Sequence, residues 1–125
     1  MKNIVICGSR HFTDYSLLSS ALDDFLSDFQ KDDICIVSGG CRGADSLALR
    51  YAQDRSISFL KFPADWQRFG KSAGVIRNFQ MLEIANICFG FHDGVSRGTA
   101  HMLRISRKKN IRTEVYYFAN QLSVF

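Results

Sequence analysis

One short stretch of the chain, residues 62–78, combines residue types that suit the binding of a small anionic ligand. It holds the only Pro and the only Trp of the chain, together with two glycines and three cations. Glycine lets a backbone approach a ligand closely, and Lys71 and Arg77 can neutralise anions. Trp66 offers a flat apolar wall, and Asn78 can both donate and accept hydrogen bonds. A surface loop that leads into an ordinary helix, with Trp66 in the core, explains the same residues equally well.

Two further loops, residues 39–43 and 96–99, are rich in glycine or small polar residues and stand directly before predicted helices. A helix N-terminus exposes unpaired N–H groups and the positive end of the helix dipole, and both features suit a phosphate group. Neither loop has the spacing of the Walker lysine loop or of the dinucleotide glycine fingerprint. For either loop alone, a tight turn from strand to helix is as good an explanation as a phosphate site.

Cations and carboxylates accompany these loops. The cations are Arg10, Arg42, Lys71, Arg77 and Arg97, and the carboxylates are Asp45, Asp65 and Asp93. Arginine can hold a phosphate group in two-pronged geometry, so the cations indicate a phosphate-bearing ligand. The carboxylates would serve the hydroxyl groups of a sugar, or they would form ion pairs with the arginines, and the sequence leaves both readings open.

The histidines give a weaker indication. His11 follows the first glycine loop and His92 ends the fourth predicted strand, so either could touch a ligand, while His101 falls in the first turn of the last helix. No two histidines have the spacing of metal ligands on a helix, and we expect neither a metal site nor a bound cofactor. The basic residues between 104 and 112 fit a solvated helix face with cations at its C-terminal end.

The elements that position these residues follow from the hydrophobic pattern. Continuous apolar runs predict strands at residues 4–7, 34–37, 57–62, 87–91 and 113–118. Apolar residues at helical spacing fall between them, over 17–29 (with Thr13 or Asp14 as N-cap), 47–52, 76–85 and 102–105. This alternation predicts an α/β three-layer sandwich, with a mostly parallel sheet of five strands or slightly more and helices on both faces. We expect residues 1–125 to form one domain.

The glycines then identify one edge of this sheet. All except Gly90 lie in loops after predicted strands or at the following helix starts, whereas the loops at the opposite edge contain none. In such folds a ligand lies outside the carboxyl ends of the strands, where the strand order reverses. We therefore expect the glycine-rich edge to be the binding edge.

Composition is that of an ordinary globular protein, with 46% hydrophobic and 22% charged residues. The net charge of +4 favours anionic partners without requiring nucleic acid. Apolar runs are strand-sized, and the first follows Met1 almost directly, so we expect no membrane span or signal peptide and a cytoplasmic protein. Cys7, Cys35 and Cys88 fit reduced core positions, and Cys41 fits an exposed thiol.

The ordered motifs, taken together, resemble the YspA-like branch of the SLOG superfamily from about Lys2 to Phe118. They are Gly8-Ser9-Arg10, Ser38-Gly39-Gly40 through Gly43-Ala44-Asp45, Ala64-Asp65-Trp66, Gly70-Lys71-Ser72-Ala73-Gly74, Arg77-Asn78 with Met81, and Ser96-Arg97-Gly98-Thr99-Ala100. SLOG domains are Rossmann-like and are related to the LOG phosphoribohydrolases, to the DNA-processing protein DprA and to nucleotide-sensing domains of bacterial immune systems. The resemblance implies recognition of a nucleotide or a nucleotide-derived ligand.

The resemblance leaves catalysis open. LOG-type hydrolases cut the N-glycosidic bond of nucleoside monophosphates with an arginine on the central helix and a Gly-Thr-x-x-Glu pattern. Arg77 matches the arginine and Gly98-Thr99 matches the start of the pattern, but the position of the glutamate holds Met102. Methionine cannot transfer a proton or stabilise an oxocarbenium ion, so this mechanism requires Asp45, Asp93 or Glu83 as a substitute.

We therefore expect a protein that senses or sequesters a phosphorylated nucleoside derivative, of the ADP-ribose or cyclic signalling type. In this hypothesis four cations hold phosphates, glycine N–H groups and the Thr99 hydroxyl donate to them, and Trp66 stacks on the base. The expected ligand-binding residues are Gly8, Ser9, Arg10, Ser38, Gly39, Gly40, Arg42, Gly43, Asp45, Asp65, Trp66, Lys71, Arg77, Asn78, Asp93, Ser96, Arg97, Gly98 and Thr99.

Two alternatives accompany this hypothesis. The first is a diverged nucleotide N-glycosidase, with Asp45, Asp93 and Arg77 as candidate catalytic residues. The second is a DprA-like module for single-stranded DNA, which is disfavoured because the cations stand among carboxylates. SLOG relatives commonly dimerise through helices and Phe125 ends an apolar C-terminus, so a homodimer or a higher homo-oligomer is expected.

Overall fold

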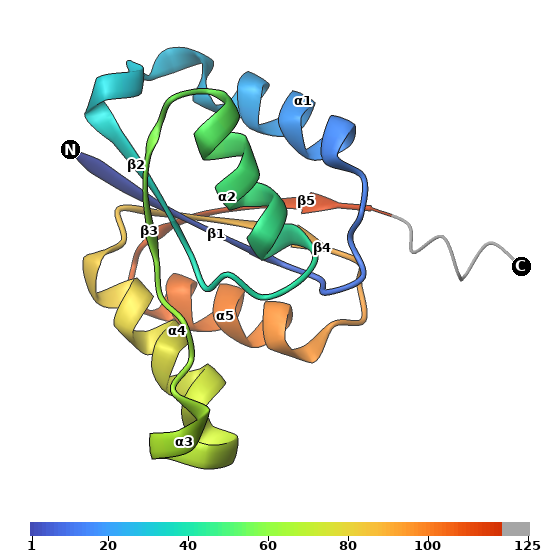
Figure 1. Cartoon of the computed structure of the whole chain (residues 1–125), viewed down its shortest axis with the longest axis vertical. Helices are drawn as coiled ribbons and strands as arrows, with labels where there is room; N and C mark the ends of the chain where they lie inside the picture. The colour runs from blue at the N-terminus through green and yellow to red at the C-terminus, as the bar shows by residue number, and fades with distance from the viewer. Residues whose placement is uncertain (119–125) are drawn as a thin grey trace, which may run out of the picture.

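A five-stranded parallel sheet with the strand order β3-β2-β1-β4-β5 forms the centre of the protein (Figure 1). The structure is a computed structural model, and it describes residues 1–118. The strands are β1 (Lys2–Gly8), β2 (Ile34–Ser38), β3 (Ser58–Lys61), β4 (Ile87–His92) and β5 (Arg112–Tyr117). The five predicted strands are confirmed, with bounds that differ by a few residues, and all of their pairings are parallel.

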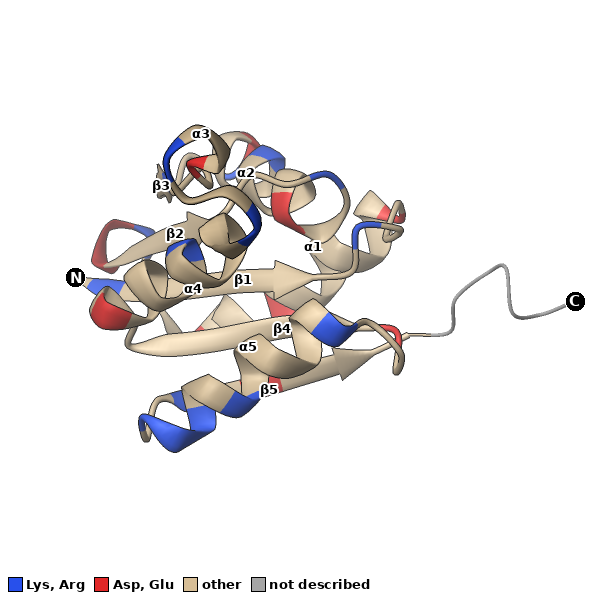
Figure 2. Cartoon of the chain, turned by 90° about the horizontal axis from the view of Figure 1, so that it is seen from below, with Lys and Arg blue, Asp and Glu red and all other residues tan. Residues whose placement is uncertain are grey.

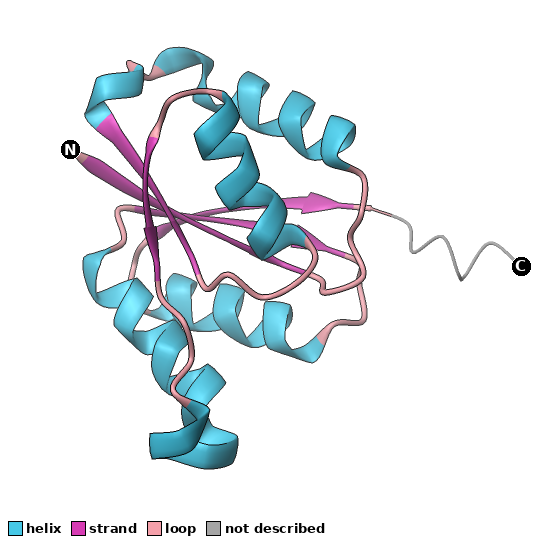
Figure 3. Cartoon of the chain, in the orientation of Figure 1, coloured by secondary structure: helices cyan, strands magenta, loops and turns pink. Residues whose placement is uncertain are grey.

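Helices cover both faces of this sheet, as the alternation of elements predicts. They are α1 (Tyr15–Phe25), α2 (Ala44–Asp54), α3 (Trp66–Phe69), α4 (Ala73–Ile84) and α5 (Arg97–Lys108). Figures 1 and 3 show α1 and α2 on one face, α4 and α5 on the other, and the short α3 projecting beyond the layers. The chain therefore has the expected three-layer α/β architecture.

The central strand β1 contributes side chains to both halves of the core, which explains its continuous apolar run. Ile4 and Ile6 pack in the core beneath α1 and α2, whereas Val5 and Cys7 belong to the second core beneath α4 and α5. Successive side chains of a strand point to opposite faces, so a strand buried on both faces requires apolar residues at every position. One run of residues thereby builds both halves of the core.

Helix boundaries agree less closely with the sequence-based expectations. Asp14 is the N-cap of α1, as predicted, and its carboxylate accepts a hydrogen bond of 3.0 Å from the backbone N–H of Leu17. The helix ends at Phe25 rather than near Phe29, because a 3₁₀ turn at Leu26–Asp28 follows it. Gly70, with a φ of 54°, ends α3 and separates it from the next turn of helix.

The strand order reverses between β1, the central strand, and its neighbour β4. Cys7 pairs with Gly90 and Gly8 pairs with Phe91, so the two strands end side by side. The loops that leave these ends lead to helices on opposite faces of the sheet, α1 and α5 (Figure 3). In folds of this kind a ligand binds at such a point of reversal.

No helix within residues 1–118 is both long and apolar enough to cross a membrane. Phe125, on which part of the expectation of an oligomer rests, lies outside the described residues.

Candidate functional site

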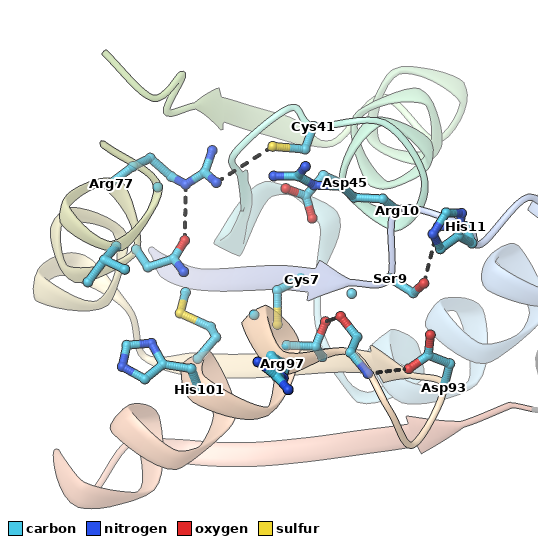
Figure 4. Close-up of a pocket in the computed structure, with 18 of the residues that line it drawn as sticks. Cys7, Ser9, Arg10, His11, Cys41, Asp45, Arg77, Asp93, Arg97 and His101 are labelled. Atoms are coloured by element: carbon cyan, nitrogen blue, oxygen red, sulfur yellow. Dashed lines mark hydrogen bonds between the residues drawn. The ribbon is translucent and has the colours of Figure 1, made fainter. Parts of the chain in front are cut away.

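A pocket of about 740 Å³ occupies the crevice at the carboxyl ends of β1 and β4 (Figure 4). Its volume is within the range of small-molecule sites. The expected binding residues that line it are Gly8, Ser9, Arg10, Asp45, Lys71, Arg77, Asn78, Asp93, Ser96, Arg97, Gly98 and Thr99. The glycine-rich edge of the sheet is therefore the edge that carries the cavity.

The N-terminus of α5 forms one side of this pocket. The first N–H groups of a helix have no partner within the helix, and the Ser96 side chain makes no capping hydrogen bond to them. The Ser96 hydroxyl instead lies 3.2 Å from the Thr99 hydroxyl. A Cβ atom added to Gly98 would meet nothing within 4 Å, so the backbone here is open to a ligand.

The Asp93 carboxylate holds the loop that leads into α5. It accepts hydrogen bonds from the backbone N–H groups of Val95, at 2.9 Å, and Ser96, at 2.7 Å. Burial acts to raise the pKa of Asp93, but these N–H groups, the Ser9 hydroxyl and His92 outweigh burial and lower it. Asp93 is therefore engaged in shaping the pocket wall, which leaves it poorly suited to act as the catalytic acid considered above.

Arg77 is 7% exposed, and its guanidinium contacts the pocket from α4. It donates hydrogen bonds to the carbonyl oxygens of Gly39, at 3.1 Å, and Phe62, at 3.3 Å, and thereby ties together the loops after β2 and β3. A Cβ atom at Gly39 would collide with this guanidinium. Glycine at position 39 therefore leaves the space that the Arg77 guanidinium occupies. Most N–H groups of this guanidinium donate to other atoms of the protein.

The Cys41 thiol also contacts this arginine. Its Sγ atom lies 3.6 Å from Nη2 of Arg77, and the residue is half-buried at the pocket wall (Figure 4). The expectation that Cys41 is an exposed thiol is therefore wrong. Cys7, Cys35 and Cys88 are buried free cysteines, as expected.

Asp45, in the first turn of α2, differs from the other pocket carboxylate. It is 8% exposed, and within residues 1–118 it forms no ion pair. Burial raises its pKa to about 6, although the charges of Arg77 and Arg10 and a backbone hydrogen bond from Cys41 oppose the rise. The pocket thus contains one carboxylate that forms no ion pair in the described part of the chain and receives one backbone hydrogen bond from the protein.

Gly43 brings this carboxylate to the pocket. Its φ of 84° turns the chain into α2, and the next residue, Ala44, donates a backbone hydrogen bond of 3.1 Å to the carbonyl of Ser9. A Cβ atom at Gly43 would collide with the same carbonyl. The close approach of the two loops places Arg10 and Asp45 on one side of the cavity.

Other expected binding residues lie outside the pocket lining: Ser38, Gly39, Gly40, Arg42, Gly43, Asp65 and Trp66. The Ser38 hydroxyl donates to the backbone carbonyl of Asp45, and the Asp65 carboxylate caps α3 by accepting from the N–H of Arg68. Trp66 is 53% exposed on α3, so it neither plugs the core nor walls the pocket. Gly39 and Gly43 make room for the Arg77 guanidinium and for the Ser9 carbonyl, respectively, rather than for a ligand.

The lining also includes residues outside the expected binding set: Cys7, His11, Cys41, Gly74, Val75, Val95, His101 and Met102. Of these, His11 is one of the two histidines that the sequence analysis names as able to touch a ligand. Met102 is 1% exposed and packs in the core cluster beneath α4 and α5. Because Met102 stands at the glutamate position of the Gly-Thr-x-x-Glu pattern, the sequence could have predicted that it lies at the pocket. The side chain gives the pocket an apolar surface where LOG-type hydrolases carry their glutamate. No cluster of three or more possible metal ligands occurs within the described residues.

Comparison with known sequences places the chain beside a described family and a phage protein. A family described as the YspA, cpYpsA-related SLOG family matches residues 2–69 of the chain. The Gene 61 protein of Mycobacterium phage D29 is 38% identical over 117 residues, which are 89% of this chain and 93% of that protein.

Solved structures of DNA processing protein A have the same fold. The Helicobacter pylori protein, described for its single-stranded DNA binding mode, matches with a TM-score of 0.64, 16% identity and coverage of 91% of this chain. The Streptococcus pneumoniae protein matches with a TM-score of 0.59, 10% identity and coverage of 90% of this chain. The chain spans only 64% and 58% of those two chains, respectively.

Proposed function

This chain belongs to the YspA, cpYpsA-related SLOG family, and we propose that its pocket binds a phosphate-bearing, nucleotide-derived small molecule that the protein senses or sequesters. Family membership supports a nucleotide-related ligand in general. One observation carries the proposal for this chain: the N-terminus of α5 opens into a cavity beside three exposed cations, Arg10, Lys71 and Arg97. None of the three forms an ion pair within residues 1–118.

Arg97 gives the clearest indication of an anionic ligand. It occupies the first position of α5, where the positive end of the helix dipole disfavours a cation by about 0.3–1 kcal/mol. No carboxylate in the first turn of α5 compensates for this charge. A phosphate group in the pocket would remove the conflict, because the free N–H groups and the guanidinium would then face the same anion.

The remaining surfaces of the pocket suit a nucleoside. Val75 and Met102 offer apolar contacts, and Asp45 offers a hydrogen-bond acceptor on the opposite side of β1. The cavity is large enough for a mononucleotide, and an ADP-ribose-type or cyclic signalling nucleotide is the finer form of the proposal.

A matched pair of variants on one helix tests the phosphate site. We expect Arg97→Gln to weaken the binding of AMP, GMP or ADP-ribose by about 10- to 100-fold, as for loss of a charged hydrogen-bond partner. Arg107→Gln removes the same charge at the far end of α5, where Figure 2 shows a second group of cations, and should leave binding unchanged.

Thermal unfolding with and without each ligand provides the first readout. A ligand at about a hundred times its dissociation constant should stabilise the wild-type fold by about 2.7 kcal/mol. If no nucleotide shifts the unfolding temperature, or if Arg97→Gln and Arg107→Gln bind equally well, the proposal is wrong.

A diverged N-glycosidase is the second candidate, and Asp45 is the observation that favours it. A carboxyl group with a pKa of about 6 can act as a general acid near neutral pH, a role for which Met102 is unsuited. Chromatography of each mixture after incubation would detect free base. Release of base by the wild type, and its loss in Asp45→Asn, would favour the enzyme over the binding protein.

Single-stranded DNA forms the third arm of the same experiment, since the Helicobacter pylori relative in fold is described for that ligand. Binding of an oligonucleotide through several phosphate contacts would weaken steeply as salt is raised. Tight, strongly salt-dependent binding of oligo(dT), without binding of mononucleotides, would replace the small-molecule proposal with a DNA-binding function.

A further inference from the structure

Of the two carboxylates that line the pocket, Asp45 is the one with fewer hydrogen bonds from the protein. It projects from the first turn of α2 toward the cavity, on the side of β1 opposite Arg97 (Figure 4). The residue is 92% buried, since 8% of its surface remains accessible. It is therefore a buried carboxylate at a cavity wall rather than a surface charge.

The protein supplies this carboxylate with few partners. An ionised carboxylate has about four sites for accepted hydrogen bonds, whereas Asp45 receives a backbone hydrogen bond from Cys41 and the charges of Arg77 and Arg10, without an ion pair to either. The other pocket carboxylate, Asp93, accepts two short backbone hydrogen bonds. Of the two carboxylates, only Asp45 keeps most of its acceptor capacity for something in the cavity.

Such an arrangement costs the folded protein free energy, because a buried charge without sufficient hydrogen bonds is unfavourable. The raised pKa of Asp45 reflects the same lack of solvation. The buried residues of α2 on either side of it, Ala44 and Ala48, are apolar and offer it no hydrogen bonds. A ligand that donates hydrogen bonds would supply the missing partners.

On the basis of the proposed function, we propose that Asp45 determines the specificity of the pocket by accepting a hydrogen bond from a donor group of the bound nucleotide, a sugar hydroxyl or a base amine. The phosphate then lies at α5 beside Arg97 and the donor group lies at α2, so the two charges of opposite sign fix the orientation of the ligand. A nucleotide that lacks the donor leaves the Asp45 carboxylate buried and unpaired, which disfavours its binding.

Titration calorimetry with a small set of probes tests this inference. The probes are AMP and GMP, their 2′-deoxy and 3′-deoxy forms, and IMP, which lacks the exocyclic amines of both bases. The proteins are the wild type, Asp45→Asn and the control Asp14→Asn. The control removes an equal charge from the exposed N-cap of α1, where Asn also caps a helix.

For the wild type we expect one class of analogue, either the deoxy forms or IMP, to bind about 10- to 100-fold more weakly than the parent nucleotide. In Asp45→Asn the parent nucleotide should weaken by a similar factor, the poor analogue should change little, and the discrimination should disappear. Discrimination against the deoxy forms would identify a sugar hydroxyl as the donor, and discrimination against IMP would identify a base amine. Asp14→Asn should behave as the wild type.

The two proposals fail in different ways. If the wild type binds AMP or GMP and Asp45→Asn binds them with the same affinity and the same discrimination, the role of Asp45 is wrong while the nucleotide site stands. If the wild type binds none of these probes, and neither ADP-ribose nor a cyclic dinucleotide, the proposed function fails and the role of Asp45 fails with it. Circular dichroism of each variant confirms that a loss of binding is not a loss of fold.

Discussion

Asp45→Asn should make the ligand-free protein more stable, which is the reverse of the usual effect of changing a buried polar residue. The substitution preserves the shape of the side chain and replaces a carboxylate that has few partners with a neutral amide. Asparagine resembles the protonated acid, so the variant avoids the cost of burying the charge. A gain of stability at the expense of binding is expected where a group serves a ligand.

The magnitude follows from the pKa of Asp45, which burial raises from 3.8 to about 6. Because the folded protein holds the proton more tightly, the wild type loses stability as the pH rises through this range, and the loss is complete above it. The cost of burying the charge, and hence the expected gain in the free energy of unfolding, is about 3 kcal/mol above pH 7 and well under about 1 kcal/mol at pH 4. The variant should therefore unfold roughly 10 °C higher at pH 8 and close to the wild-type temperature at pH 4.

Chemical denaturation at pH 4, 6 and 8 is the direct assay, with Asp14→Asn as the control. The gain should grow with pH in Asp45→Asn and be absent from the control, which loses an exposed charge but keeps its helix cap. No gain at pH 8, or an equal gain at pH 4 and pH 8, would contradict the conclusion that the fold leaves Asp45 poorly solvated.

The remaining predictions concern the residues that hold the pocket walls. Arg77→Met should destabilise the protein by about 2–4 kcal/mol, because the buried carbonyl group of Gly39 and the part-buried carbonyl group of Phe62 lose their donor; a loss below about 1 kcal/mol in urea unfolding would contradict this role. Gly43→Ala should cost about 2–4 kcal/mol, since the residue has a φ of 84° and no room for a Cβ atom. In Gly98→Ala the new Cβ atom meets nothing within 4 Å, so the free energy of unfolding should stay nearly unchanged or rise slightly, while ligand binding weakens. Equal destabilisation by Gly43→Ala and Gly98→Ala would refute the conclusion that Gly43 makes room for the protein and Gly98 for a ligand.

The sequence predicted the fold and the edge of the sheet that holds the pocket. These features follow from local patterns: apolar runs such as residues 4–7 identify strands buried on both faces, and the placement of glycine after strands identifies one edge. Carboxyl ends of parallel strands must meet at that edge, so no tertiary information was needed to place Arg10 and Arg97 near one cavity.

Tertiary structure alone decided which of these side chains remain free for a ligand. Arg77 donates a hydrogen bond to the carbonyl of Gly39, which lies 38 residues earlier in the chain, and no spacing rule relates the two positions. In the same way, backbone N–H groups satisfy Asp93, whereas Asp45 is left with little more than one backbone hydrogen bond, and the sequence presents the two carboxylates as equals. Periodicity reports which face of an element is buried, but the partner of each buried polar group depends on how distant loops pack against one another.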